Sequence, residues 1–276
     1  AMGLQKFIKY VDPTLYSDYQ LESFVNTNTS NNIKVTDFVT KPKFKTIYNI
    51  PSADALFNAG ACRIKTFPPE FMARQYLENR KVPLTDLWYT DDFAEFVSVI
   101  FPAHDKTLYK EPRIIIPFYD KDGNLIGAQG RAIGPSKIKY ITVKSNEDAP
   151  KIFGWNKVDT SKRIYVVEGP IDSLFLVNGI ATMDAALYKA APMVGLDFDY
   201  TFVYDNEPRN KQVVSNMVKT IAAGRKCCIW PDTIQQKDIN EMVLAGNSPA
   251  VIQHIIDNNT YEGLMATMKL NQWSRL

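Results

Sequence analysis

The 276-residue chain has little cysteine and little histidine, with three cysteines and two histidines. Two of the cysteines, Cys227 and Cys228, are neighbours, so in a strand their side chains point to opposite faces and do not bridge each other. We therefore expect no disulfide framework and a reducing environment for the chain. The scattered positions of Cys62, His104 and His254 do not match the spacing of a closed zinc site.

Long apolar runs are also missing, which excludes a protein built on transmembrane helices. The N-terminus has no secretory or transit pattern. An excess of charge is missing too, because 32 Lys and Arg residues face 30 Asp and Glu residues, for a net charge of +2. A protein held on nucleic acid by charge alone would be far more basic. A nucleic-acid role therefore needs local basic patches beside acidic clusters, as in a metal-dependent nucleotidyl-transfer site.

What is present is an ordinary globular composition, with 45% hydrophobic and 22% charged residues, which fits one large domain or two smaller ones. Residues 1–50 contain a polar run, 26–32, and are predicted to be a linker and docking segment. The opening residues Ala1-Met2-Gly3 are typical of a cloning scar, so we expect the natural protein to continue upstream.

Residues 51–160 are predicted to form an α+β subdomain. Apolar runs on both sides of an Asp-Gly turn predict a β-hairpin, and a third strand follows it. Two amphipathic helices are expected before the hairpin. The expected helices are 53–61 and 69–79, and the expected strands are 114–119, 125–131 and 140–143.

Residues 161–246 change to a β-α-β rhythm, which predicts a parallel sheet covered by helices on both faces. The expected strands are 164–167, 180–183, 200–204 and 227–230. The expected helices are 171–177, 185–192, 210–223 and 238–245. Residues 247–276 are predicted to form a short helical tail. Its apolar residues, among them Leu264, Met265 and Met268, either dock a partner or pack back on the domain.

Acidic side chains stand where three of these parallel strands end. Glu168 follows the first strand, Asp205 and Glu207 follow the third, and Asp238 follows the fourth after a short loop. Taken singly, an acid at a strand end is more often a helix cap or a solvated loop residue. Because the carboxyl ends of parallel strands converge at one edge, these carboxylates would repel one another unless a cation lay between them. Hard oxygen ligands with open positions are typical of a Mg²⁺ site.

Three acidic motifs carry a resemblance to a known fold: Glu168-Gly169…Asp172, Asp205-x-Glu207 and Lys237-Asp238-x-x-Glu241. They resemble the Toprim fold that primases, topoisomerases and some nucleases share. Residues 111–117, 122–123, 129–131, 139–140 and 151–154 resemble the strip that precedes Toprim in bacterial-type primases. Residues 168–174, 205–209 and 263–269 are most similar to the DNA primases of T-even-like phages.

The resemblance implies an α/β Toprim domain, a parallel sheet flanked by helices, preceded by an α+β subdomain and followed by a short helical tail. It implies a primase RNA-polymerase core that makes short RNA primers on single-stranded DNA from ribonucleoside triphosphates by nucleotidyl transfer. Mg²⁺, or Mn²⁺ in its place, would be the cofactor, and the zinc module of such primases is expected outside this chain. The resemblance also implies a replicative helicase as partner and the host-cell cytoplasm, within a phage replisome, as the location.

The same resemblance assigns roles to the acids. Glu168, Asp205 and Glu207 are the expected catalytic residues and, with Asp238, the expected metal ligands. Glu168 could instead act as a general base. Three further residues could contact the metal ligands without binding the metal themselves, namely Asp172, Lys237 and Glu241. Toprim proteins generally have aspartate where this chain has Glu207, which leaves one ligand position open to question.

Basic side chains are the expected partners of the triphosphate. By resemblance these are Arg113, Arg131, Lys139 and Lys151, and for each the alternative is an ordinary solvated cation. Two other functions stay open. A Toprim nuclease would share the acids without needing the basic strip, and a non-catalytic replisome or single-stranded-DNA-binding module would retain the acids only as parts of the fold.

Overall fold

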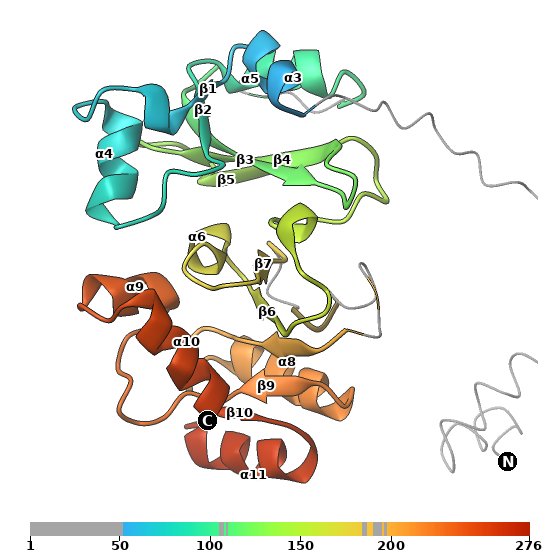
Figure 1. The fold of residues 1–276 in the computed structure, drawn as a ribbon, viewed down its shortest axis with the longest axis vertical. Coiled ribbons are helices and arrows are strands. Elements are labelled where there is room, and N and C mark those ends of the chain that lie inside the picture. Colours follow the sequence, from blue (N-terminus) through green and yellow to red (C-terminus); the bar gives the residue numbers. More distant parts are fainter. Residues whose placement is uncertain (1–51, 105–107, 109, 184–186, 190–194, 196–197) are drawn as a thin grey trace, which may run out of the picture. The chain divides into compact units, whose positions relative to one another are not determined.

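Two five-stranded sheets organise the residues that the computed structural model describes (Figure 1), which are 52–104, 108, 110–183, 187–189, 195 and 198–276. All of them belong to one compact unit. The predicted linker of residues 1–50 and most of the predicted helix 185–192 lie outside the described residues.

The first sheet is antiparallel throughout, with strand order β1-β2-β3-β4-β5. Its strands are β1 (Cys62–Arg63), β2 (Trp88–Thr90), β3 (Arg113–Tyr119), β4 (Leu125–Ala132) and β5 (Tyr140–Lys144). The helices that accompany it are α3 (Ser52–Asn58), η2 (Ile64–Thr66), α4 (Met72–Asn79) and α5 (Phe93–Ile100). The predicted hairpin is confirmed as β3–β4. The Asp120 carboxylate accepts hydrogen bonds from the backbone of Asp122 and Asn124 in the turn, and Gly123 has a φ of 82°.

The second sheet has the order β10-β9-β8-β6-β7, and its first four strands in the chain run parallel. Its strands are β6 (Ile164–Val167), β7 (Gly179–Ala181), β8 (Tyr200–Phe202), β9 (Lys226–Cys228) and the antiparallel β10 (Thr260–Tyr261). Its helices are α6 (Pro170–Ser173), α8 (Lys211–Ala222), α9 (Ile239–Leu244), α10 (Pro249–Asn258) and α11 (Gly263–Trp273), with short 3-10 turns η3 (Trp155–Lys157) and η4 (Leu187–Lys189). The predicted parallel sheet is thereby confirmed.

Both faces of strand β3 are buried, each in a different core. Ile114 and Ile116 belong to a large core that also contains Val166 of β6. Ile115, which points the other way, belongs to a smaller core with Phe93 of α5. The two-residue repeat of a strand explains this alternation. Because the large core contains residues of both sheets, the two sheets form a single folded body.

Several predicted elements differ from the structure in their bounds; for example, the helix predicted over 69–79 is Met72–Asn79, and the strand predicted over 200–204 is Tyr200–Phe202. The helix predicted over 171–177 ends at Ser173, and the strand predicted over 180–183 is Gly179–Ala181. A Cβ at Gly179 would lie 2.7 Å from the Ser173 carbonyl oxygen, so the chain turns tightly between these two elements. The predicted tail begins with α10, and β10 pairs with β9, which makes this segment part of the second sheet.

Helix α11 packs back on the domain with one side and leaves apolar side chains of the other side exposed. Ala266, Leu270 and Trp273 are buried, whereas Leu264 and Met265 are exposed.

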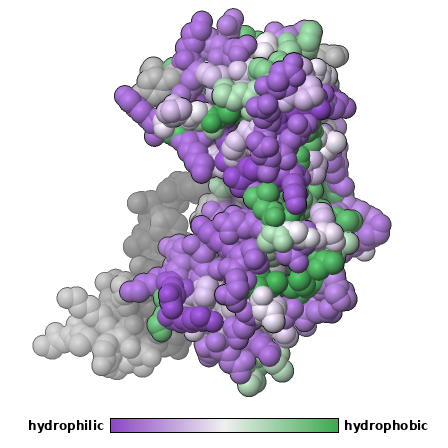
Figure 2. All heavy atoms as spheres, turned by 90° about the vertical axis from the view of Figure 1, so that its left-hand side faces the viewer, coloured by the Kyte–Doolittle hydropathy of each residue, from purple (hydrophilic) through white to green (hydrophobic). Residues whose placement is uncertain are grey.

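On the face of the molecule shown in Figure 2, hydrophilic residues predominate and hydrophobic ones gather around the middle. Within the part of the chain that the structure describes, no helix has the length and apolar character needed to cross a membrane.

Candidate active site

A small cavity lies where the strands of the second sheet end, and it contains three carboxylates. Asp172 comes from the first turn of α6, Asp205 follows β8, and Asp238 is the N-cap residue of α9. We call this space the acid cavity. Its lining consists of Val167, Asp172, Val203, Tyr204, Asp205, Trp230, Asp238 and Ile239. Of the four acids expected as metal ligands, Asp205 and Asp238 line the acid cavity, whereas Glu168 and Glu207 do not.

The carboxylates of the acid cavity repel one another. Burial, followed by the charges of Asp172, Glu168 and Asp238, raises the pKa of Asp205 to about 7. Burial, followed by the charge of Asp238, raises the pKa of Asp172 to about 7 as well. Glu168 is exposed at the end of β6 but contributes to this field. The site thus holds negative charge that the protein itself does not fully neutralise.

Asp172 occupies a more central place than its predicted supporting role. One of its carboxylate oxygens, Oδ1, accepts a hydrogen bond of 2.9 Å from the backbone N–H of Asn240. The other, Oδ2, lies so close to Gly169 that a Cβ there would come within 2.9 Å of it. The glycine that follows Glu168 therefore gives the Asp172 carboxylate room beside the acid cavity.

The motif Lys237-Asp238-x-x-Glu241 builds the start of α9. The carboxylate of Asp238 accepts a hydrogen bond of 2.7 Å from the Glu241 backbone N–H. In return, the Glu241 carboxylate accepts one of 2.9 Å from the Lys237 backbone N–H. This reciprocal arrangement resembles a capping box, so Glu241 holds the turn that presents Asp238.

Lys237 brings a positive charge to the acids. Its ammonium lies 3.4 Å from a carboxylate oxygen of Glu207 and 3.9 Å from one of Asp205. Burial opposes this charge, but Glu207, Asp205 and Asp238 together raise the pKa of Lys237 above its ordinary value. Glu207 also accepts a hydrogen bond of 3.2 Å from the Asn210 side chain. Glu207 is thus already engaged by two neighbouring side chains.

The acids are close together without forming a closed ligand set. Among the described residues, no three His, Cys, Asp or Glu side chains are grouped tightly enough to hold a metal ion as they stand. Each of the acids Asp172, Asp238 and Glu207 has a hydrogen-bond or ion-pair partner within the protein. A cation would therefore have to draw the carboxylates inward.

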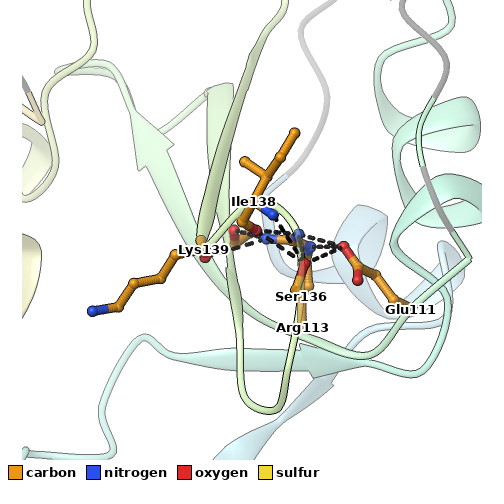
Figure 3. A network of polar contacts seen from close by, with 6 residues as sticks. Glu111, Arg113, Ser136, Ile138 and Lys139 are labelled. Carbon is orange, nitrogen blue, oxygen red and sulfur yellow. Dashed lines mark hydrogen bonds and ion pairs between the residues drawn. The ribbon is translucent and has the colours of Figure 1, made fainter.

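Arg113 of β3 is buried and bonded entirely within the protein (Figure 3). Its guanidinium donates to the Glu111 carboxylate and, at 2.7 Å each, to the backbone oxygens of Gly130 and Ile138. Further contacts at 3.3 and 3.4 Å reach the Ser136 hydroxyl and the Lys139 backbone oxygen. The expectation that Arg113 grips a phosphate is not supported by this geometry, because its donors hold the 136–139 loop instead.

Arg131 of β4 interacts electrostatically with Asp172 of the acid cavity. Its guanidinium is 4.9 Å from the ring centres of both Tyr76 and Tyr140 and donates to their hydroxyl groups. Burial lowers its pKa, and electrostatic interactions link it to Tyr76, Arg80 and Asp172. The Nε atoms of Arg131 and Arg80 are both buried without a hydrogen-bond partner. Tyr76 and Arg80 were not singled out from the sequence, although they are one helical turn apart.

Lys139 and Lys151, the other two expected phosphate-binding residues, are exposed. The Lys139 ammonium lies 5.7 Å from the ring centre of Tyr140, and in Figure 3 its side chain points away from Arg113. The charge of Lys151 contributes to lowering the pKa of Lys144, although burial of Lys144 is the larger cause. Their predicted role in binding nucleotide stays a prediction.

Asn240 connects the acids to the first subdomain, and no sequence signal marked it except its place between Asp238 and Glu241. Besides its backbone bond to Asp172, its side-chain NH₂ donates to the Arg80 carbonyl oxygen at 2.7 Å. The Lys81 ammonium donates to the Val243 carbonyl oxygen of α9 at 3.3 Å. Helix α9 is therefore fastened to the end of α4.

Solved structures share this architecture. A DnaG primase catalytic domain bound to single-stranded DNA matches with a TM-score of 0.53, covering 74% of this chain and 78% of that chain at 15% identity. The RNA polymerase domain of Mycobacterium tuberculosis DnaG matches with a TM-score of 0.53, covering 75% and 84% at 14% identity. The zinc-binding and RNA polymerase domains of Aquifex aeolicus primase match with a TM-score of 0.52. This match covers 94% of this chain and 71% of that chain at 16% identity.

At such low identity these likenesses show the fold, which is that of the RNA polymerase domains of bacterial-type primases. No protein-family model matches the chain. The DNA primase of Enterobacteria phage T4 is 31% identical over 277 residues, which cover 98% of this chain and 78% of that protein. The chain therefore belongs to the DNA primase family, whose members are DNA-directed RNA polymerases.

Proposed function

We propose that nucleotidyl transfer takes place at the acid cavity, where the chain joins ribonucleotides into short primers on a single-stranded DNA template. The 3′ hydroxyl of one nucleotide would attack the α-phosphate of the next, and pyrophosphate would leave. The observation that carries this proposal is the meeting of Asp172, Asp205 and Asp238 at one sheet edge, with Arg131 electrostatically linked to Asp172. A nuclease would need the acids but not the arginine.

The carboxylates fit Mg²⁺, or Mn²⁺ in its place. They offer hard oxygen donors, and their mutual repulsion is what a divalent cation would relieve. Glu168, Asp205 and Asp238 would hold the ion, with Asp172 beside them. Bound Mg²⁺ would stabilise the negative charge that develops on the attacking and phosphoryl oxygens. Glu207 stays a candidate ligand, although Lys237 engages it.

The chain's own side chains would orient the nucleotide. Arg131 is held between two tyrosine rings, so its guanidinium is fixed before a phosphate arrives. Lys139 and Lys151 would add positive charge at the surface, while Arg113 holds the loop that presents Lys139. Glu168 would either bind the cation or accept the proton of the attacking hydroxyl. Lys237, Glu241 and Asn240 would keep the acids in place.

Family membership also supports the partners expected from the sequence. These are single-stranded DNA as template, ribonucleoside triphosphates as substrates and a replicative helicase, in the cytoplasm of the infected host. The DnaG domain with the same fold was solved with single-stranded DNA bound. Leu264, Met265 and Met268 form an exposed apolar row on α11 where a helicase could dock.

The test is to incubate the chain with labelled ribonucleotides, Mg²⁺ and single-stranded DNA. Oligoribonucleotides that require all three components would support the proposal. Cleavage of the template would indicate the nuclease instead. DNA binding without either product would indicate a non-catalytic module. Arg131→Ala provides a matched variant, since a nuclease relying only on the acids would be far less affected by it.

A further inference from the structure

The C-terminal end of α11 is fastened to both loops that carry the acids. The indole N–H of Trp273 donates to the Asn206 side-chain oxygen at 3.1 Å. Two residues later, the Arg275 backbone N–H donates to the Pro208 carbonyl oxygen at 2.9 Å. The Arg275 guanidinium also lies 3.6 Å from an Asp232 carboxylate oxygen, in the loop before α9. Trp273 itself is only 6% exposed.

Asn206 receives this contact from a position between two candidate ligands, Asp205 and Glu207. Its backbone N–H donates to the Lys237 carbonyl oxygen at 2.7 Å. Its side-chain NH₂ donates to the carbonyl oxygens of Ile234 and Gln236 at 3.0 and 3.1 Å. Every polar group of the Asn206 side chain is thus used, and most of these bonds hold the 234–237 loop that leads into Asp238.

The indole and the two loop carbonyls select the same orientation of the Asn206 amide. An indole N–H can only donate, so it selects the amide oxygen as its partner and leaves the NH₂ for the two loop carbonyls. Rotating the amide would place donor against donor at Trp273 and acceptor against acceptor at the loop. The contact from α11 therefore supports the bonds that join the Asp205 segment to the Asp238 segment.

We propose that Trp273 is a positioning residue for the acid cavity and acts through Asn206. Its N–H orients the amide, the amide holds the 234–237 loop, and the loop keeps Asp238 in register with Asp205. This inference rests on the proposed function, in which these acids hold a divalent cation. Removing an outer group that orients metal ligands commonly weakens metal binding by about tenfold or more.

The test uses Mn²⁺ alone as the probe, with free Mn²⁺ measured by electron paramagnetic resonance in titrations of the full chain. Trp273→Phe keeps an aromatic ring in the core and removes the N–H donor together with part of the ring volume, which the packing control below addresses. We expect it to bind Mn²⁺ about tenfold more weakly than the wild type. The matched control is Leu270→Val on the same buried helix face, which disturbs packing without touching Asn206 and should bind Mn²⁺ normally.

A double-mutant cycle separates positioning from packing. If Trp273 acts through Asn206, Trp273→Phe should weaken Mn²⁺ binding in the wild-type background but not further in an Asn206→Ala background. Additive losses would overturn the inference, and so would unchanged binding by Trp273→Phe. If Trp273→Phe does not fold, Asn206→Ala alone decides, because wild-type affinity in that variant would also overturn it.

Asp205→Asn distinguishes failure of this inference from failure of the proposed function. If Asp205→Asn binds Mn²⁺ as the wild type does, the acid cavity is not the metal site. Both the proposed function of the cavity and the proposed role of Trp273 are then wrong. If Asp205→Asn weakens binding while Trp273→Phe does not, only the role of Trp273 is wrong.

Discussion

Two arginines on neighbouring strands of one hairpin have opposite surroundings. Arg113 directs its donors to oxygens of its own subdomain, whereas Arg131 lies between two aromatic rings and interacts electrostatically with Asp172. Nothing local in the sequence separates them, because each stands in an apolar strand. Their roles follow from what packs beside them, which comes from α4, α5 and the 136–139 loop.

Arg113→Lys should destabilise the fold. Lysine cannot reproduce the several directed hydrogen bonds that the buried guanidinium makes, so carbonyl oxygens of the 136–139 loop would lose their donors. We expect the free energy of unfolding in denaturant to fall by about 2 kcal/mol or more. An unchanged unfolding midpoint would show that the Arg113 network contributes nothing to stability.

Arg131→Ala should impair nucleotide use instead. Losing one charge-assisted contact to phosphate should cost about 2 kcal/mol, or about a thirtyfold fall in kcat/KM for ribonucleotides. Arg131→Lys keeps the charge but not the planar fork, and should recover only part of the activity. Wild-type rates at both limiting and saturating nucleotide would mean that Arg131 is a structural cation.

Gly169→Ala should disturb Asp172 while leaving the backbone unstrained. The φ of Gly169 is −96°, which alanine adopts readily, but the new Cβ would lie 2.9 Å from the Asp172 carboxylate. Displacing the Asp172 carboxylate, which lies beside the proposed metal ligands, should lower Mg²⁺-dependent synthesis by about a hundredfold. Gly134→Ala is the matched control, because a Cβ there meets nothing within 4 Å. Equal activity in the two variants would contradict this reading of Gly169.

At the scale of elements, the strand β6 could be predicted to the residue, because Ile164–Val167 is an unbroken apolar run buried on both faces. The two-residue strand β10 could not, since it exists only by pairing with β9 some thirty residues earlier in the chain. The acids Asp205 and Asp238 could be placed from strand ends. The bonds of Asn240 and Trp273 could not, because their partners lie in distant segments.

The link between α4 and α9 gives an element-scale prediction. Asn240→Ala removes the hydrogen bond from its side chain to the Arg80 carbonyl oxygen and should lower the free energy of unfolding by about 1–2 kcal/mol. Asn247→Ala is the control, because the Asn247 side chain bonds the Met242 carbonyl oxygen within its own turn. A larger loss for Asn247→Ala than for Asn240→Ala would contradict the importance of this link.

At the scale of the whole molecule, the large core shared by both sheets fixes Arg131 relative to the acids. Catalysis by positioning needs a fixed arrangement of these groups, because cation-binding and phosphate-binding side chains on separate bodies would not keep their relative positions.

The net charge of +2 adds little nonspecific attraction to DNA, and such attraction falls steeply with salt. Whatever template binding rests on contacts between local basic side chains and phosphates should weaken as salt rises, which a titration of labelled single-stranded DNA would measure.

The central claim, that the acid cavity performs nucleotidyl transfer, is tested most directly by Glu168→Gln. The substitution removes one charge at an exposed strand end and keeps the side-chain shape, so the melting temperature should stay close to that of the wild type. Dinucleotide synthesis from labelled ribonucleotides, Mg²⁺ and single-stranded DNA should fall about a thousandfold or more. Near wild-type synthesis by the folded variant would contradict the claim.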